Sequence, residues 1–369
     1  MVKLDRRYFA QFDWVSFILV LLISLVGLAT VFSATTSALC ARSVHFDKHV
    51  WGILAGIVIY LFFCAQDYHK LERWGYFAFY VLVIILIITL IKGSIGIWGA
   101  QRWISIAGIR FQPSEFAKLL LPPFFTYLIA TEKRRPFKLH TFLFFLGILS
   151  FVCVLILKQP DLGTAIIIFL EGLILLWAAD FPRKYFITLF IIMGLCAPAG
   201  WFMLKPYQKN RIIVYMGGGD LHKERYHIEQ SKIAIGSGGI CGKGYLKGTQ
   251  NHLCFLPARR TDFIFSVFAE EFGLIGCFLL IILFLLLFIR SYTFLPDIID
   301  PHAQLLAFGL ITPVALSTFI NISMGLGLAP VVGIPLPFMT CGLSHNLITF
   351  AALGWAHGIL ARRFSMLAP

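Results

Sequence analysis

The chain has 369 residues, of which 59% are hydrophobic and only 13% are charged, and its mean hydropathy is +0.84. A soluble domain is about half apolar and about a quarter charged, so this composition excludes a soluble globular protein and indicates a polytopic membrane protein. The net charge of +13 could suggest nucleic-acid binding, but the basic residues are scattered and form no patch interleaved with aromatic residues. Nucleic acid is therefore not an expected partner, and an anionic lipid or lipid phosphate explains the charge better.

Ten apolar stretches are long enough to cross a bilayer as helices, which takes about 17 residues or more. In chain order they are 14–33, 50–66, 75–93, 113–131, 140–157, 163–180, 185–204, 262–289, 303–325 and 342–361. No clear cleavage site follows the first stretch, so we expect it to remain as a span. The sequence predicts an all-α, polytopic membrane domain over 1–369, with a large extracytoplasmic loop (205–261) before the eighth span.

The distribution of lysine and arginine predicts the orientation of these spans. The short segments on the side of the N-terminus carry more of them than the short loops on the other side. The positive-inside rule therefore favours two cytoplasmic termini. The loops 94–112 and 205–261 and the sequence KQPDLG (158–163) then lie on the outer side, where the polar candidate residues gather.

Cysteine and histidine spacings do not predict a metal site. The eight cysteines form no CxxC pair, and the ten histidines form no HExxH or similar spacing. Cys241 and Cys254 share the large loop, and the sequence leaves open whether they form a disulfide.

The glycine-rich sequence AIGSGGICGKGYLKG is not a phosphate-binding P-loop. Ser237 occupies the first glycine position of GxxxxGK[ST], and Gly244 follows the lysine. We expect the glycines to let an ordered loop pack tightly across the outer mouth of the bundle. With Arg211, Lys243 and Lys247, this loop could still bind a lipid pyrophosphate.

Two further segments carry polar residues at expected helix starts. In GAQRWISIAGIRFQPSEFAKLLLPPF, Glu115 lies in the first turn of a helix and Lys118 follows on the same face. One interpretation is an ion pair that anchors the helix mouth; the other places both residues in a polar cavity, with Arg102 as an anion contact. In QPDLGT, Asp161 taken alone is best interpreted as the N-cap of the next helix.

The sequence RRTDFIFSVFAEEFGLIG places Asp262 at the start of the eighth span. Asp262 could simply cap this helix, but ionisable residues in membrane segments are functional candidates by default. One stripe of the helix is small and polar, which is typical of a face turned to a bundle interior or a cavity: Asp262, Ser266, Ala269 and Gly273. Arg259 and Arg260 stand beside Asp262 and could hold an anionic group. A carboxylate in this setting suits a general base that acts on the hydroxyl of an amphiphile.

TDFIFSVFAEEFGLIG, QPDLGTA, GAQRWI…QPSEFAKL and the glycine-rich sequence together resemble the SEDS family (shape, elongation, division and sporulation proteins), which includes RodA and FtsW. The resemblance covers nearly the whole chain, and QPDLGTA and LGLAPVVGIPLPF are more similar to RodA. It implies a peptidoglycan glycosyltransferase of the bacterial cytoplasmic (inner) membrane. Such an enzyme polymerises lipid II into β-1,4-linked glycan at the outer face, for cell elongation and shape.

The resemblance also assigns roles to individual residues. The family's catalytic aspartate falls on Asp262, and its Glu–Lys pair falls on Glu115 and Lys118. The same matching gives the residues of the cavity and its rim: Arg102, Gln159, Asp161 and Gln230. Asp262 would take the proton of the acceptor's GlcNAc 4-hydroxyl as this oxygen attacks the donor's anomeric carbon. The leaving undecaprenyl pyrophosphate would be stabilised by Arg102, Arg259 or Lys118, or by a divalent cation (Mg²⁺ or Mn²⁺).

The implied partners are a class B penicillin-binding protein, which supplies transpeptidation, and other proteins of the elongation complex. The family usually has LPE and a histidine before TDFIF, where this chain has Ala258 and Arg260. The family's SYGGSS is replaced by TCGLSHN (340–346). These departures change the contacts expected near the substrate. The alternatives are a lipid II flippase, an FtsW-like division polymerase and a non-catalytic scaffold. A transporter should carry its charges near the membrane midplane and show inverted repeats, whereas these candidates lie at the outer mouth.

Overall fold

The structure, a computed structural model, describes residues 11–36, 44–92, 94–95, 101–106, 109–132, 135–219, 225–253, 255–256 and 258–363. Each of the ten apolar stretches folds as an α-helix: α2 (Trp14–Thr35), α3 (Val44–Ala65), α4 (Tyr68–Lys92), α5 (Pro113–Thr131), α6 (Leu139–Lys158), α7 (Leu162–Ala178), α8 (Arg183–Met203), α12 (Ile264–Thr293), α13 (Pro301–Gly325) and α14 (Leu343–Leu360). Seven helices in the described part of the chain are long and apolar enough to cross a membrane. The protein is therefore a multi-span α-helical membrane protein.

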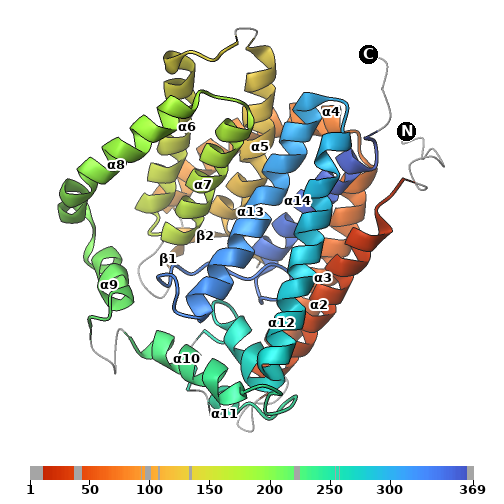
Figure 1. The fold of residues 1–369 in the computed structure, drawn as a ribbon, viewed down its shortest axis with the longest axis vertical. Helices are drawn as coiled ribbons and strands as arrows, with labels where there is room; N and C mark the ends of the chain where they lie inside the picture. Colours follow the sequence, from red (N-terminus) through yellow and green to blue (C-terminus); the bar gives the residue numbers. More distant parts are fainter. Residues whose placement is uncertain are drawn as a thin grey trace.

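The bundle has two main apolar clusters. The larger one joins α2, α3, α12, α13 and α14, and the second joins α4 to α7. Gly354 and Gly358 let α14 lie directly on α3, because a Cβ at either position would come within 2.4 Å of Tyr60 O or 2.8 Å of Cys64 O. This GxxxG spacing is a common solution for close helix packing in membranes. By contrast, α8 runs along the edge of the bundle with most of its side chains exposed (Figure 1).

A short antiparallel sheet lies in the segment 94–112, which the sequence predicts only as a loop. Its strands are β1 (Ser94–Ile95), β2 (Gln101–Ile106) and β3 (Ile109–Phe111), in the order β1-β2-β3. In β2, the β-branched and aromatic residues of RWISI favour a strand. The hairpin pairs Ile104 with Phe111 and Ile106 with Ile109, which brings β2 back to the start of α5.

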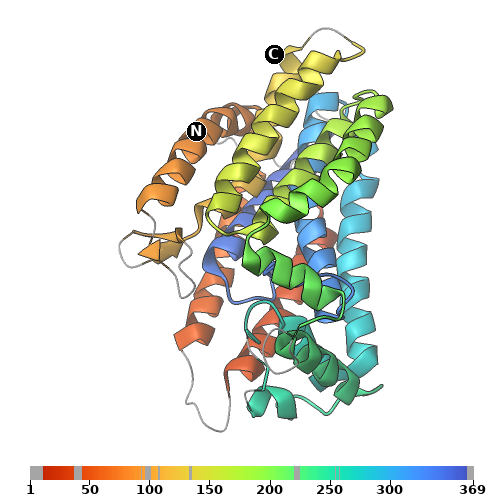
Figure 2. The same cartoon turned by 90° about the vertical axis from the view of Figure 1, so that its left-hand side faces the viewer.

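The large loop is also partly helical. It contains α9 (Pro206–Tyr215), α10 (Tyr226–Gly238) and α11 (Thr249–His252), which gather at one end of the bundle (Figures 1 and 2). Near the other end, Arg290 binds Asp13 at 2.8 Å, and Arg363 lies 4.0 Å from Asp297 in the 3-10 helix η1 (Leu295–Asp297). These contacts join the start of α2 to the ends of α12 and α14.

The glycine-rich loop is inserted into a break in α12. Gly273 has φ 65° and ψ −163°, which interrupts the helix. Two backbone hydrogen bonds of the helix are therefore not made at this point. The loop backbone replaces the missing bonds: Lys243 N donates to Glu270 O at 3.1 Å, Gly244 N to Glu271 O at 3.0 Å, Leu274 N to Gly239 O at 2.9 Å and Ile275 N to Ile240 O at 3.2 Å. Buried backbone groups need such partners. The glycines therefore serve close backbone contact, as expected for a packed loop.

The same contact uses the charge of Lys243. Its Nζ lies 2.7 Å from Oε1 of Glu270, whose side chain is fully buried. That oxygen also accepts from Thr249 Oγ1 at 3.1 Å and from Gln250 N at 3.0 Å. Lys243 is therefore engaged in holding the loop on α12. Cys241 is an exposed free cysteine, and Cys254, the other residue of the disulfide that the sequence left open, lies outside the described residues.

Candidate active site

A cavity of about 590 Å³ lies where six segments of the chain meet. They are β2, the start of α5, the turn before α7, α9, the segment before α12 and the loop before α14. Five of the residues predicted from the sequence line this cavity: Arg102, Glu115, Asp161, Arg211 and Asp262. Residues far apart in the chain are therefore brought to one site.

Asp262 is available for chemistry because it does not cap α12. The N-cap of this helix is Phe263, and no side chain caps it. Asn321 fixes the Asp262 backbone by donating from Nδ2 to Asp262 O at 3.1 Å and to Ile334 O at 2.7 Å. Burial raises the pKa of the Asp262 carboxyl above its ordinary value, although a hydrogen bond with Thr261 and nearby arginines act in the opposite direction. Asp262 is thus a partly buried carboxylate at a cavity wall.

Two arginines give the cavity its positive charge. Arg102 donates from Nε to Gln159 O at 3.1 Å and from Nη2 to Pro160 O, which fixes its side chain. Nη1 of Arg211 is buried and has no hydrogen-bond partner among the described residues. Burial, followed by the charge of Arg102, lowers the pKa of Arg211. A guanidinium donor without a partner beside a second arginine is suited to an anion such as a phosphate.

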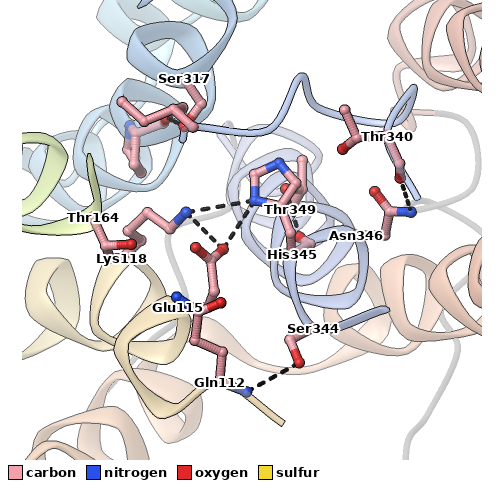
Figure 3. Close-up of polar contacts among 12 residues, drawn as sticks. Gln112, Glu115, Lys118, Thr164, Ser317, Thr340, Ser344, His345, Asn346 and Thr349 are labelled. Carbon is pink, nitrogen blue, oxygen red and sulfur yellow. Dashed lines mark hydrogen bonds and ion pairs between the residues drawn. The ribbon is translucent and has the colours of Figure 1, made fainter. Parts of the chain in front are cut away.

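The structure shows the ion pair of Glu115 and Lys118, but it places only Glu115 in the large cavity. Lys118 Nζ lies 2.6 Å from Oε2 of Glu115, and both side chains are buried. The same oxygen lies 2.9 Å from Nδ1 of His345 on α14 (Figure 3). Glu115 and His345 line the large cavity, whereas Lys118 borders a second cavity of about 10 Å³. The pair is an ion pair at the mouth of α5, and one partner faces the site.

Asp161 also combines a structural position with a place at the cavity. Its Oδ1 accepts from Thr164 N at 3.3 Å and so caps α7. Its Oδ2 accepts from Gln112 Nε2 at 2.7 Å and from Ser114 Oγ at 2.8 Å. The cap predicted from the sequence is confirmed, and these bonds also link the start of α7 to the start of α5.

Five predicted cavity or rim residues do not line the cavity: Lys118, Gln159, Gln230, Arg259 and Arg260. The Gln159 side chain is fully buried and donates to Leu86 O at 2.9 Å, so it faces α4. Arg259 is buried, and the Arg260 backbone oxygen accepts from Cys341 N at 3.0 Å. Arg259 and Arg260 therefore do not line the cavity, although they are close to Asp262 in the sequence. The arginines that line it are Arg102 and, from α9, Arg211.

The sequence did not single out His345, Tyr207 or Trp103, all of which line the cavity. For His345 a signal existed, because it belongs to the departure TCGLSHN. For Trp103 the signal was the strand pattern of β2, which puts the residue next to Arg102. The position of Tyr207 in the cavity depends on how α9 and the rest of the large loop fold over the bundle, and no local sequence pattern predicts this.

The described residues contain no group of three or more histidine, cysteine, aspartate or glutamate side chains that could hold a metal ion. The carboxylates of Glu115 and Asp161 already accept hydrogen bonds from protein donors. The donor set of the cavity therefore does not fit a resident divalent cation.

Comparisons with known proteins agree with this architecture. The chain is 35% identical over 319 residues to the peptidoglycan glycosyltransferase MrdB of Escherichia coli K12, covering 86% of each chain. It is 34% identical to MrdB of Helicobacter pylori 26695, covering 98% of this chain and 93% of the relative. Probable peptidoglycan glycosyltransferases named FtsW are similar at 31–32% identity.

Two solved structures share the fold. One is a chain from a peptidoglycan synthase complex that coordinates polymerization and crosslinking, with a TM-score of 0.82 and 24% identity over 96% of this chain and 98% of that one. The other is the rod shape determining protein RodA of Thermus thermophilus, with a TM-score of 0.71 and 22% identity over 96% and 98%. The family model of FtsW, RodA and SpoVE, described as cell cycle protein, matches residues 12–363. The chain therefore belongs to the SEDS family of FtsW, RodA and SpoVE proteins.

Proposed function

We propose that Asp262 is the catalytic base of this chain, a peptidoglycan glycosyltransferase of the SEDS family. The observation that carries the proposal is the position of Asp262: it lines the cavity that also holds Arg102 and Arg211, and it does not cap α12. A carboxylate whose pKa is raised above its ordinary value is a better base than a fully solvated one. Function in cell elongation and shape is supported by the higher identity to MrdB than to FtsW relatives.

The reaction is a single displacement with inversion. The 4-hydroxyl of the acceptor GlcNAc transfers its proton to the Asp262 carboxylate, and its oxygen forms a bond to the anomeric carbon of the donor. The bond between that carbon and the pyrophosphate oxygen breaks, and undecaprenyl pyrophosphate leaves with the electron pair. Arg102 and Arg211 stabilise the charge that develops on the pyrophosphate. Because this leaving group needs no general acid, one carboxylate is sufficient, in contrast to hydrolysis of a glycosidic bond.

We assign no step to a metal ion. A divalent cation would share the charge of the pyrophosphate with the arginines, but the cavity carboxylates fit hydrogen-bond donors better than such an ion. Two guanidinium groups can bind a pyrophosphate and offset most of its negative charge. Arg102 and Arg211 therefore supply positive charge for the leaving group.

The proposed topology has ten spans, cytoplasmic termini and the cavity open to the outer face of the bacterial inner membrane. The lysine and arginine distribution supports this orientation. The single domain 1–369 would carry the large loop 205–261 on the outer side, where α9 contributes Arg211 to the cavity. Lipid II would then reach the site from the outer leaflet.

The proposed partner is a class B penicillin-binding protein that crosslinks the nascent glycan. The structural match to a chain of a complex that coordinates polymerization and crosslinking supports this assignment. A glycan polymerase and a transpeptidase act on the same strand, so a complex of the two keeps the product of one near the site of the other. Other elongation proteins would join this complex.

The test is polymerisation of purified lipid II by the complex with its cognate penicillin-binding protein, with glycan chains read on a gel. Asp262→Asn should abolish the polymer while the complex stays intact. Asp297→Asn is the matched control, because its half-exposed side chain lies 4.0 Å from Arg363, near the other end of the bundle; it should retain polymerisation. Equal polymer from native protein and Asp262→Asn would refute the assignment of the base. If native protein also makes no polymer, a lipid II translocation assay would test the transporter alternative.

A further inference from the structure

His345 is a buried histidine at the start of α14, in the segment where this chain departs from the family pattern. Its Nδ1 lies 2.9 Å from Oε2 of Glu115, the oxygen that also accepts from Lys118 at 2.6 Å. Figure 3 shows the three side chains pointing toward one another from α5 and α14. The His345 side chain is 6% exposed, so this geometry is fixed by packing.

The chemistry of the three groups determines the proton positions. Glu115 beside a lysine is a carboxylate, which can only accept, so the hydrogen of the neutral imidazole must be on Nδ1. Lys118 also has only donors, and its separation of 3.5 Å from Nδ1 is therefore a close approach and not a hydrogen bond. Lys118 and His345 are thus two donors to one carboxylate oxygen.

This arrangement orients the other oxygen of Glu115. Oε1 has no hydrogen-bond partner among the residues that the structure describes, and Glu115 lines the same cavity as Asp262. Lys118 alone, on a flexible stem, would fix the carboxylate less well than two donors from different helices. A carboxylate oxygen held toward the cavity binds a hydroxyl or an amide N–H, and it repels a phosphate, whose charge suits Arg102 and Arg211.

We propose that His345 is a positioning residue for glycosyl transfer in this chain: its Nδ1–H holds Glu115 so that Oε1 accepts a hydroxyl or amide N–H of the sugar substrate. The inference rests on the proposed function and adds a sugar subsite to it. The subsite recognises the donor groups of the sugar, while the arginines recognise the pyrophosphate. His345 acts through Glu115 and takes no part in bond making.

Three substitutions separate the role of Nδ1 from that of bulk. His345→Ala removes the donor, His345→Asn places an amide N–H near the position of Nδ1, and His345→Gln places its amide near Nε2 instead. Losing a hydrogen bond to a charged group lowers a binding or rate constant by a factor of about 10 to 100. We therefore expect His345→Ala and His345→Gln to lower kcat/KM for lipid II at least about tenfold, mainly through KM. His345→Asn should recover most of this loss.

Thr349→Val is the matched control, because Thr349 donates only to the His345 backbone oxygen, at 2.8 Å, one turn further along α14. The assay is initial-rate polymerisation by the complex with its penicillin-binding protein, at several lipid II concentrations. Equal rates for native protein and His345→Ala, or equal losses for His345→Asn and His345→Ala, would overturn the inference. If either result is found while Asp262→Asn is inactive, the inference about His345 fails but the proposed glycosyltransferase function stands. If the native complex makes no polymer, the result counts against the proposed function.

Discussion

Replacing Gly273 by alanine tests whether the glycine-rich loop holds the two parts of α12 together. The backbone at this position has φ 65° and ψ −163°, a region that is almost restricted to glycine and costs other residues about 1–3 kcal/mol. A Cβ would also lie 2.3 Å from Gly242 N and 2.6 Å from Ile240 O. The loop must therefore move away from the helix when alanine is introduced.

The expected loss follows from the bonds that this movement breaks. Four backbone hydrogen bonds cross from the loop to α12, and each contributes about 1 kcal/mol net. Losing two of them in addition to the strain gives about 3–5 kcal/mol, a large fraction of the 5–15 kcal/mol of a typical domain. The variant should therefore unfold at a clearly lower temperature than the native protein.

The assay is thermal unfolding of the detergent-purified protein, followed by tryptophan fluorescence. Gly194→Ala is the control, because Gly194 lies within α8 and a Cβ there meets no atom within 4 Å; alanine should be neutral or slightly stabilising. Equal unfolding temperatures for the two variants would refute the reasoning that the loop replaces the broken helix ladder.

Two further predictions concern ionisable groups. Lys243→Met should destabilise the protein by about 3 kcal/mol, because it leaves the fully buried Glu270 carboxylate without its cation; a double variant with Glu270→Gln should unfold nearer to the native temperature, and no difference between single and double variants would contradict this. Because burial raises the pKa of Asp262 above 3.8, kcat/KM should fall as the pH decreases through this raised pKa, and a profile with no fall on its acidic side would argue against Asp262 as the base. The same pKa shift also affects stability: the Asp262 carboxyl contributes most to the stability of the folded state below pH 3.8, and this contribution is lost as the pH rises through the raised pKa. Asp262→Asn should therefore be at least as stable as the native protein in thermal unfolding at neutral pH.

The sequence by itself determined the helical architecture and the candidate base. Apolar length depends only on consecutive residues, so all ten helices could be located, with errors confined to their ends. Asp262, Glu115 and Asp161 stood out because carboxylates at helix starts in an apolar chain are rare and costly. The strands of the small sheet were missed because a short hairpin in a loop has little hydrophobic periodicity.

Only the tertiary structure decided which polar residues share the cavity. Arg259 is three residues from Asp262 in the chain but does not line the cavity, whereas Arg211 reaches it because α9 folds back over the bundle. The contact of His345 with Glu115 joins α14 to α5, residues 230 positions apart. The break at Gly273 likewise required the loop that fills it. These features arise from contacts between distant segments, which no local periodicity or spacing encodes.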